Sequence, residues 1–239
     1  MQSFKRLNMI LLLLAGLLLT QCRSNDKPAD VVENAPDTTK FDSTPVPLPP
    51  PPRPVPDYDT LEWTDLHLLD ESIVLDMRYA TDSNFVEETM YDCGRCFLRP
   101  EVALKIVKAH KALQERELGL KMFDCYRPRP IQWKLWKKIP DARYVSDPRK
   151  GSMHNRGAAV DLTIVDAEGR QLDMGTAFDF FGPRAWSTYQ DLPDSVLANR
   201  RLLRSVLEAE GFAGIRTEWW HFSYSGMRYE ISDMLWNCE

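Results

Sequence analysis

The sequence predicts an α+β domain in which an antiparallel sheet is flanked by helices. Three observations indicate this class. Apolar residues recur with helical spacing from residue 100 to residue 118. Residues 160–164 alternate between apolar and polar, which is typical of a strand with one buried face. The turn sequence Asp166-Ala-Glu-Gly169 follows this strand at once and predicts a hairpin.

The first 22 residues resemble an export signal. Lys5 and Arg6 precede an uncharged apolar run over 9–20, which is shorter than the ~20 residues that a membrane span requires. Residues 19–22 resemble a lipobox ending in a lipidated Cys22, although Gln21 is larger than the residue usual there. We expect a signal peptide over 1–22 and an exported protein, lipid-anchored to a bacterial membrane, in the periplasm or at the cell surface. Ordinary signal cleavage near Cys22, without a lipid, is the alternative.

Residues 23–56 are predicted to form a proline-rich, disordered tether. Ten of the 17 prolines lie between Pro28 and Pro56. Such a composition buries too little apolar surface to fold, and its prolines favour the extended polyproline II conformation. The expected role is a spacer between membrane and domain, with partner binding as the alternative. The net charge of −5, without a basic block, argues against nucleic acid as the main partner.

Residues 57–239 are predicted to form one domain of ordinary size. Its first half is expected to begin with a strand over 73–77. A helix is expected over 100–118, because Pro100 suits the first helical position and Gly119 suits the stop. A short strand over 121–125 and a short helix over 131–138 follow.

The second half of the domain is expected to begin with the alternating strand over 160–164. The hairpin turn leads from it into a strand over 170–172. A helix is expected over 194–210, with Gly211 as its stop. The aromatic-rich segment 219–224 is predicted to be a strand, since aromatic residues are enriched in strands.

Four cysteines lie within the domain: Cys93, Cys96, Cys125 and Cys238. An even number of cysteines in an exported chain predicts two disulfides, and three pairings are possible. The spacing Cys93-x-x-Cys96 also fits half of a zinc ribbon. That alternative requires a second closely spaced pair, whereas Cys125 and Cys238 are far apart in sequence.

A candidate metal site is formed by His154, Asp161 and His221. Asp161 lies inside an apolar strand, where a lone carboxylate is costly unless a partner compensates for its desolvation. Gly157 lets the chain turn sharply between His154 and that strand. Two imidazoles and one carboxylate suit a catalytic zinc ion, since three protein ligands leave a fourth position for water. The alternatives are hydrogen-bonded histidines and a salt bridge from Asp161 to Arg156.

Glu218 is the candidate general base for a water that the metal activates. It precedes His221 by three residues, and residues three apart on a regular strand point to opposite faces. We therefore expect Glu218 just before the strand or at a bend, leaning over the metal.

Five ordered motifs resemble those of a known family. Ser152-x-His154-x-x-Gly157-x-x-x-Asp161 and Glu218-x-Trp220-His221 resemble the signature of the D-alanyl-D-alanine peptidases with the Hedgehog-type zinc fold, and are most similar to that of the VanX-like dipeptidases. Further similar segments lie at 78–85, 124–128 and 174–180. The resemblance extends from about residue 61 to residue 224. It implies one zinc ion per chain and a small-molecule substrate.

The resemblance also implies a role for each site residue. His154, Asp161 and His221 match the zinc ligands, and Glu218 matches the catalytic base. Arg127 matches an arginine that stabilises the oxyanion; its alternative role is a buried salt bridge to Asp124.

The other matched residues concern the two ends of the substrate. Tyr79 and Asp179 match groups around the substrate's free ammonium, and Ser152 matches a hydroxyl near its C-terminal carboxylate. The alternatives are that Asp179 caps the loop beside Gly182 and that Ser152 only shapes the turn before His154.

The activity implied is the zinc-dependent hydrolysis of D-alanyl-D-alanine to two D-alanines. An exported enzyme of this kind is expected to serve turnover or salvage of dipeptides released from the cell wall. One alternative is a D,D-carboxypeptidase that trims peptidoglycan stem peptides, which should leave the amine side of the site open. The other is a non-catalytic wall-binding module with the zinc fold, which needs neither Glu218 nor Arg127. The sequence predicts no oligomeric state.

Overall fold

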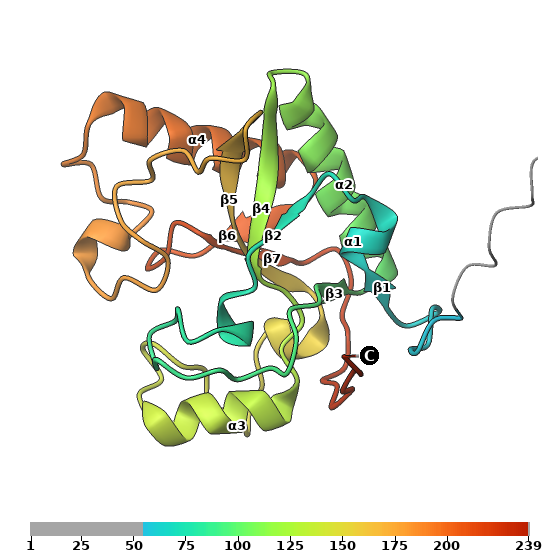
Figure 1. The fold of residues 1–239 in the computed structure, drawn as a ribbon. Coiled ribbons are helices and arrows are strands. Elements are labelled where there is room, and N and C mark those ends of the chain that lie inside the picture. Colours follow the sequence, from blue (N-terminus) through green and yellow to red (C-terminus); the bar gives the residue numbers. More distant parts are fainter. Residues whose placement is uncertain (1–54, 239) are drawn as a thin grey trace, which may run out of the picture. The chain divides into compact units, whose positions relative to one another are not determined.

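A mixed sheet of five strands forms the centre of the domain (Figure 1). The structure is a computed structural model, and it describes residues 55–238. In spatial order the strands are β2 (Val74–Leu75), β4 (Leu118–Asp124), β5 (Ala159–Asp166), β7 (His221–Tyr224) and β6 (Phe212–Gly214). The predicted α+β class is confirmed. One pair departs from the expected antiparallel sheet, because β2 runs parallel to β4.

The parallel pair follows from the path of the chain between these two strands. Parallel neighbours need a crossover of about a dozen residues or more. Here the chain passes through the 3-10 turn η1 (Arg78–Ala80), strand β3 (Phe97–Leu98) and helix α2 (Pro100–Gln114). Strand β3 pairs antiparallel with β1 (Thr64–Asp65) in a separate two-stranded sheet, and the short helix α1 (Leu66–Leu69) follows β1.

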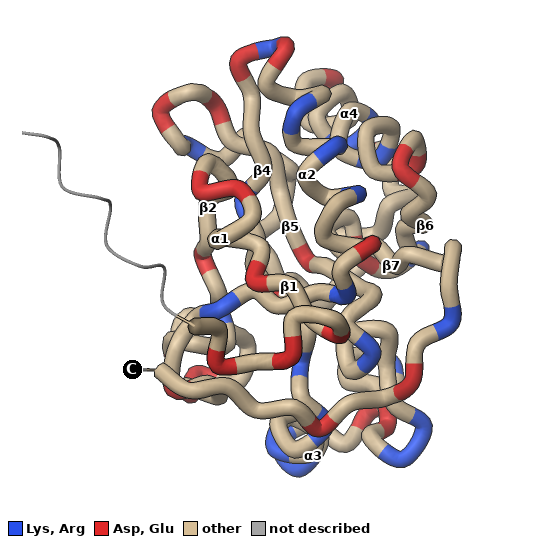
Figure 2. The backbone as a smooth tube through the Cα atoms, turned by 90° about the vertical axis from the view of Figure 1, so that its right-hand side faces the viewer, with Lys and Arg blue, Asp and Glu red and all other residues tan. Residues whose placement is uncertain are grey.

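Two helices, α2 and α4 (Asp194–Ala209), lie on the same side of β4 and β5 (Figure 2). Val160, Leu162 and Ile164 of β5 join one core cluster with Leu203 and Leu207 of α4. Because side chains alternate along a strand, Asp161 of β5 points to the opposite face. Helix α3 (Arg129–Lys138) lies beyond the end of β4, away from these helices (Figure 1). Asp161 therefore points away from the helical layer.

Most predicted elements form, with shifted ends. The helix expected over 100–118 ends at Gln114, because a turn with Glu117 at φ 57° leads into β4 at Leu118. Helix α3 begins two residues earlier than expected, and α4 ends at Ala209. The strand expected over 219–224 is confined to β7, which leaves Trp219 and Trp220 in the preceding loop.

The predicted hairpin turn forms after β5, but its second strand is reduced. The amide of Asp166 donates to the carbonyl of Arg170 at 2.9 Å, which closes the turn. Beyond it only an isolated bridge between Val165 and Gln171 pairs the two arms. Strands β1, β3 and β6 were not predicted, since two or three residues carry too little alternation to be recognised.

The four cysteines of the domain form two disulfides, as predicted. Cys93 pairs with Cys238, and Cys96 pairs with Cys125. The zinc-ribbon alternative is therefore wrong. The first disulfide ties the C-terminal segment 229–238 to the region before β3, and the second ties the end of β4 to the same region.

The N-terminal predictions fall outside the described residues. The signal peptide over 1–22, the lipidated Cys22 and nearly all of the tether over 23–56 stay predictions. Within residues 55–238, no helix combines the length and the apolar character that crossing a bilayer would demand.

Candidate active site

Three elements bring His154, Asp161 and His221 together. In the antiparallel pair of β5 and β7, Asp161 lies directly opposite His221. His154 opens the 3-10 turn η2 (His154–Arg156), which ends at Gly157 with φ 67°. A β-carbon at position 157 would collide with the ring of Trp63, and φ in this region also favours glycine. The glycine therefore allows the turn that returns His154 to the mouth of β5.

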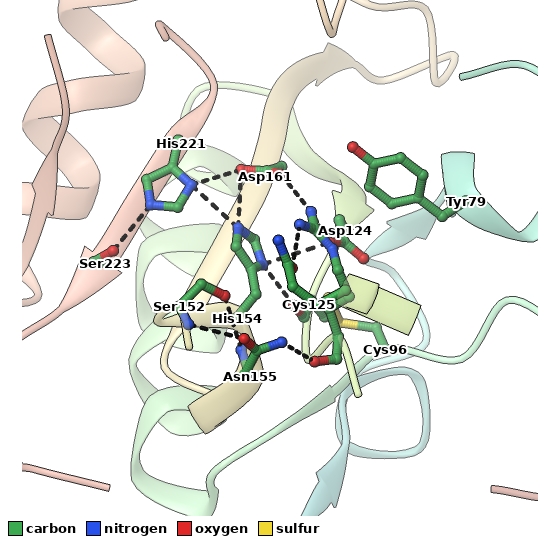
Figure 3. Close-up of polar contacts among 12 residues, drawn as sticks. Tyr79, Cys96, Asp124, Cys125, Ser152, His154, Asn155, Asp161, His221 and Ser223 are labelled. Atoms are coloured by element: carbon green, nitrogen blue, oxygen red, sulfur yellow. Dashed lines mark hydrogen bonds and ion pairs between the residues drawn. A yellow bond between two sulfur atoms is a disulfide. The ribbon is translucent and has the colours of Figure 1, made fainter. Parts of the chain in front are cut away.

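The donor atoms of these three residues converge on one point (Figure 3). His154 Nε2 lies 3.1 Å from His221 Nδ1 and 3.4 Å from Asp161 Oδ1. Asp161 Oδ1 lies 3.0 Å from His221 Nδ1. The three atoms all lie within 4.8 Å of one another. The alternative salt bridge between Asp161 and Arg156 does not form, since Arg156 donates to the carbonyl of Tyr229 instead.

The outer nitrogen of each imidazole is held by another group. His154 Nδ1 lies 2.7 Å from the carbonyl oxygen of Cys125, and His221 Nε2 lies 3.0 Å from Ser223 Oγ. A carbonyl only accepts, so Nδ1 of His154 carries the proton and Nε2 presents a lone pair in the neutral ring. Metal-ligating histidines are usually held in this way. The donor set consists of two imidazole nitrogens and one carboxylate oxygen, and such a set fits a zinc ion.

Electrostatics in the site are dominated by Asp161, which is 4% exposed. Burial would raise the pKa of this carboxyl, but the charge and hydrogen bonds of His154 and His221 hold the pKa below its usual range. Burial would likewise lower the pKa of His154, but the nearby carboxylate of Asp161 outweighs it and the pKa is raised. Asp161 is thus an anion that attracts cations into this site.

Glu218 lies in the loop directly before β7, as expected from its spacing to His221. It lines the same cavity as the three donors. Within residues 55–238, no hydrogen bond or ion pair holds its carboxylate. Burial raises the pKa of Glu218, and the charge of His221 opposes that shift. A carboxyl group with a raised pKa and a free oxygen suits a group that accepts and returns a proton.

Arg127 forms the salt bridge considered for it and also lines the cavity. Its Nε and one terminal nitrogen donate to Asp124 Oδ2 at 3.0 and 2.7 Å, and the other terminal nitrogen donates to Gln132 Oε1 at 3.0 Å. A guanidinium has five N–H donors, so two remain for another acceptor. The side chain also lines the cavity, and its Nη2 lies 3.9 Å from Asp161 Oδ2. The salt bridge to Asp124 therefore fixes a guanidinium that still faces the cavity.

Tyr79 and Asp179 meet at the wall of the cavity. The Tyr79 hydroxyl donates to Asp179 Oδ2 at 3.3 Å. Burial raises the pKa of the Asp179 carboxyl, and the nearby Asp161 adds to the effect. Asp179 has a left-handed backbone, with φ 59°, which is uncommon outside glycine and often marks functional sites. Among residues 55–238, Asp179 makes no hydrogen bond to the loop at Gly182, contrary to the alternative role considered.

Ser152 shapes the turn before His154 and also reaches the cavity. Its hydroxyl oxygen accepts from the amide of Asn155 at 3.2 Å, and its own amide donates to Asn155 Oδ1 at 2.8 Å. Because the oxygen acts as the acceptor, the hydroxyl hydrogen remains available to a ligand. Ser152 lines the cavity together with the other predicted residues.

One cavity of about 290 Å³ joins all of these side chains. Its lining includes every site residue predicted from the motifs, namely Tyr79, Arg127, Ser152, His154, Asp161, Asp179, Glu218 and His221. Aromatic side chains from separate loops, Phe85, Tyr144 and Phe181, contribute to its wall. Phe181 packs against Phe85 and Tyr144 with ring centroids 5.0 and 4.6 Å apart. A small polar ligand would be largely enclosed here.

Several supporting residues were missed by the sequence analysis. Gln132 holds Arg127, Ser223 holds His221, and Asn155 Nδ2 donates to the carbonyl of Arg127 at 2.7 Å. The acceptor for His154 is the backbone carbonyl of Cys125. Ser223, two residues after His221 on the same face of a strand, had a usable signal. The others depend on contacts between distant segments.

The remaining histidines lie outside the cavity. His67 is exposed. His110 of α2 accepts from the amide of Leu120 through Nδ1 at 3.0 Å, so its Nε2 carries the proton and donates to Ser72 Oγ at 2.9 Å. A ring that donates to a serine cannot activate it as a base. His110 therefore links α2 to β4 and to the segment before β2.

Comparisons with known proteins agree with the motifs. The family described as D-ala-D-ala dipeptidase, Peptidase_M15, matches residues 59–235. The D-alanyl-D-alanine dipeptidase of Escherichia coli is 37% identical over 69% of this chain and 85% of that protein. The enzyme of the same name from Enterococcus faecalis is 30% identical over 62% of this chain and 83% of that protein.

A solved structure of the vancomycin resistance D,D-pentapeptidase VanY in complex with Zn(II) is similar over 55% of this chain and 74% of that chain. Its sequence identity is 16% and the TM-score is 0.38. The extent and identity of the sequence matches confirm the resemblance seen in the motifs. The chain therefore belongs to the Peptidase_M15 family of D-Ala-D-Ala dipeptidases, and it is an enzyme of the metallopeptidase class.

Proposed function

We propose that this enzyme is a zinc-dependent dipeptidase that hydrolyses D-alanyl-D-alanine to two D-alanines. The observation that carries the proposal is the content of the cavity. It combines a three-donor metal site, an unpaired carboxylate, a fixed guanidinium and a hydroxyl–carboxylate pair within about 290 Å³. The names of its relatives support the substrate. One zinc ion per chain is proposed, held by His154, Asp161 and His221.

The charges that line the cavity support a cation there. Asp161, Asp179 and Glu218 contribute three carboxyl groups, whereas Arg127 contributes one permanent positive charge. Two imidazole nitrogens and a carboxylate oxygen face one another at 3.0–3.4 Å with no apolar atom to separate them. When bound, zinc polarises the substrate carbonyl and lowers the pKa of the attacking water towards ~7.

Glu218 moves the proton in this proposal. Its carboxylate takes the proton of the attacking water as the oxygen adds to the peptide carbonyl carbon. It then gives the proton to the nitrogen of the leaving D-alanine, so that the C–N bond breaks and both products depart. General acid–base catalysis of this kind contributes about 10²–10⁴-fold in rate. The absence of a competing partner among residues 55–238 leaves the carboxylate of Glu218 available for both transfers.

Arg127 stabilises the negative charge that develops on the carbonyl oxygen. The salt bridge to Asp124 and the hydrogen bond to Gln132 hold the guanidinium in place before the reaction starts. Such preorganised donors lose no energy to reorientation, and one of them is worth about 3–4 kcal/mol in the transition state. The guanidinium carbon lies 4.8 Å from the centroid of the Tyr79 ring, and this stacking further restricts the motion of the guanidinium.

Tyr79 and Asp179 bind the free ammonium of the substrate. The raised pKa of Asp179 means that the cavity penalises its lone negative charge, and a substrate ammonium would offset that cost. An acylated nitrogen has no charge and leaves the carboxylate unpaired. A D,D-carboxypeptidase must accept such acylated nitrogens, so this pair favours the dipeptidase over that alternative. At the other end, the Ser152 hydroxyl donates to the substrate carboxylate.

The biological role proposed is turnover or salvage of dipeptides released from the cell wall. It depends on the predicted export signal and lipid anchor, which lie outside the described residues. An enzyme outside the cytoplasm meets released dipeptide and not the cytoplasmic pool of precursors.

The proposal is tested with the zinc-loaded protein and free D-Ala-D-Ala. Two D-alanines should appear for each dipeptide consumed, and a chelator should abolish the activity until zinc is restored. The isomer L-Ala-L-Ala, at the same concentration, serves as the control substrate. A protein that binds zinc at one equivalent but leaves D-Ala-D-Ala intact would contradict the proposed activity.

A further inference from the structure

The disulfide between Cys96 and Cys125 lies beside His154 of the candidate metal site (Figure 3). Both residues are fully buried. The carbonyl oxygen of Cys125 is the acceptor for His154 Nδ1, at 2.7 Å. This contact decides which nitrogen of the ring carries the proton and in which direction Nε2 points. Cys125 therefore carries the cross-link and also orients one of the three metal donors.

The backbone at Cys125 lacks the support of the sheet. Strand β4 ends at Asp124, and its pairing with β5 shifts register between Met122 and Asp124. Such an irregularity bends the strand and interrupts its hydrogen bonds. Beyond it, the amide of Tyr126 donates to the carbonyl of Phe97 in β3. The segment that carries the Cys125 carbonyl is therefore held by hydrogen bonds to β3 and to the turn η2, and the disulfide adds a covalent link to the β3 region.

Cys96 is a firm anchor for this cross-link. It immediately precedes β3, which pairs with β1, and its own carbonyl accepts from the amide of Leu66 at 2.8 Å. The disulfide thus fixes the end of β4 to the small β1–β3 sheet. The region of β3 also contacts the segment after β4 and the turn η2, because Tyr126 donates to Phe97 and Arg99 donates to the carbonyls of Arg156 and Gly157.

The second disulfide provides a comparison within the same molecule. Cys93–Cys238 starts three residues before Cys96 but holds the C-terminal segment 229–238. That segment contacts η2 through Ser232, whose amide donates to the carbonyl of Asn155 at 2.9 Å, and through Tyr229, whose carbonyl accepts from Arg156. Within residues 55–238, no hydrogen bond or ion pair joins it to the two imidazoles or the carboxylate of the metal site. The two cross-links share a region of the fold but differ in their relation to His154.

We propose that Cys125, clamped by Cys96, is a positioning residue for the metal centre, and that this disulfide sets the zinc affinity. The inference rests on the proposed zinc site. The cross-link holds the Cys125 carbonyl at the distance at which it fixes the His154 ring, so that Nε2 faces Asp161 and His221 before metal arrives. Full zinc affinity is then acquired only when Cys96 and Cys125 are oxidised.

The test compares two double variants of the full protein. In one, Cys96→Ala is combined with Cys125→Ala; in the other, Cys93→Ala is combined with Cys238→Ala. The zinc dissociation constant of each folded protein is measured by competition with a chelator, and Tm is measured without zinc. The first variant should bind zinc about 10- to 100-fold more weakly, as expected when a group that supports a metal ligand is lost. The control variant should stay within about threefold of the wild type.

Zinc affinity and Tm should rank the two double variants in opposite order. The Cys93–Cys238 cross-link spans 145 residues and the Cys96–Cys125 cross-link spans 29. A cross-link that closes a longer loop restricts the unfolded chain more, so the control variant should lose more in Tm. A purely structural role would make zinc affinity follow Tm and rank the variants the other way. Cobalt(II) absorption spectra of both variants report whether the ligand geometry has changed in the first variant alone.

Two failures are distinguishable. If the wild type binds no zinc, the proposed function itself is wrong. If the wild type binds zinc and removal of the Cys96–Cys125 disulfide leaves both the dissociation constant and the cobalt spectrum unchanged, the positioning role is wrong. Should the alanine pair not fold, Cys96→Ala with Cys125→Val refills part of the vacated volume and is measured in its place.

Discussion

Asp161 shows how a single residue in a strand can indicate a site. Its neighbours in β5 are apolar and buried, and Asp161 itself is 4% exposed. Burial of an unpaired carboxylate is costly, so the sequence required partners for it. The structure supplies His154 and His221 at hydrogen-bonding distances. Residues of this kind can be predicted, because the sequence itself shows a charged residue between apolar strand residues, where burial of the charge is costly.

Other residues of the site could not be predicted at this scale. The carbonyl of Cys125 has no signature, because every residue carries a carbonyl. Gln132 binds Arg127 from the next helix, and that contact depends on how α3 packs beyond β4. The motif matched Arg127 to an oxyanion-stabilising arginine, with a salt bridge to Asp124 as the alternative. The structure shows the salt bridge and places the guanidinium in the cavity wall.

Removal of a metal ligand and removal of the base should have separable effects. His221→Ala should contain much less than one zinc ion per chain when one equivalent is supplied, because one of the three metal ligands is absent. Glu218→Gln should keep one zinc per chain and lose about 10²–10⁴-fold in kcat, because the amide cannot accept a proton. Metal analysis and steady-state kinetics on the purified variants check both expectations. Zinc retained at the wild-type level in His221→Ala would end the assignment of that ligand.

Asp179 should govern recognition of the substrate amine. Asp179→Asn preserves the shape of the side chain and removes the charge that meets the ammonium. Loss of one partner of a buried charge pair costs about 2–5 kcal/mol, which corresponds to at least ~30-fold in kcat/KM. The zinc content should be unchanged, since Asp179 is not one of the three proposed metal ligands. Tyr79→Phe, which removes one hydrogen bond to the same carboxylate, is the milder companion variant. Equal kcat/KM for Asp179→Asn and wild type would contradict the role of this carboxylate.

At the level of elements, the periodicity of the sequence predicted the helices and strands whose formation depends on local interactions. Helix α2 was expected from Pro100 and its apolar face, and β5 was expected from its alternation. The parallel pairing of β2 and the short strands β1 and β3 depend on contacts between segments far apart in sequence. Glu218 was correctly expected outside the strand, because the period of a strand could not place it beside His221.

The turn η2 should be sensitive to its glycine. Gly157→Ala forces a side chain into the left-handed region, which costs about 1–2 kcal/mol, and adds a collision with Trp63. The expected result is a lower free energy of unfolding together with weaker zinc binding, because the turn carries His154. Gly169→Ala is the matched control, since it has φ 77° but open space around its β-carbon. Chemical denaturation and zinc titration of both variants are compared. A loss of zinc affinity in the control as large as that in Gly157→Ala would contradict the account.

The C-terminal segment should loosen at alkaline pH through Tyr126. The Tyr126 hydroxyl donates to the carbonyl of Met234 at 3.1 Å, and burial raises its pKa to about 12. The folded protein holds this proton more tightly than the unfolded chain does. The contribution of the Tyr126 hydroxyl to the free energy of unfolding is therefore complete below pH ~10 and is lost as pH rises from ~10 towards ~12. Thermal unfolding between pH 8 and pH 11 should show a smaller decline for Tyr126→Phe than for the wild type. Parallel declines would show that Tyr126 does not contribute.

At the scale of the whole molecule, the site is assembled from segments that the sequence keeps far apart. Tyr79 and Asp179 are 100 residues apart and share a hydrogen bond. Family motifs located these residues, but only the fold shows that they line one cavity. The disulfide pairing also required the fold, because four cysteines allow three pairings and the sequence favoured none of them. Export, lipid anchoring and the tether remain predictions.

The central claim is that this cavity hydrolyses a free dipeptide, and one comparison tests it most directly. The zinc-loaded enzyme is assayed side by side on D-Ala-D-Ala and on N-acetyl-D-Ala-D-Ala. Acetylation removes the ammonium and leaves Asp179 unpaired in a closed site. The account predicts that kcat/KM falls by at least about 100-fold, at ~1.4 kcal/mol for each factor of ten. Comparable kcat/KM on both substrates would mean that the metal chemistry is right and the enzyme is a carboxypeptidase instead.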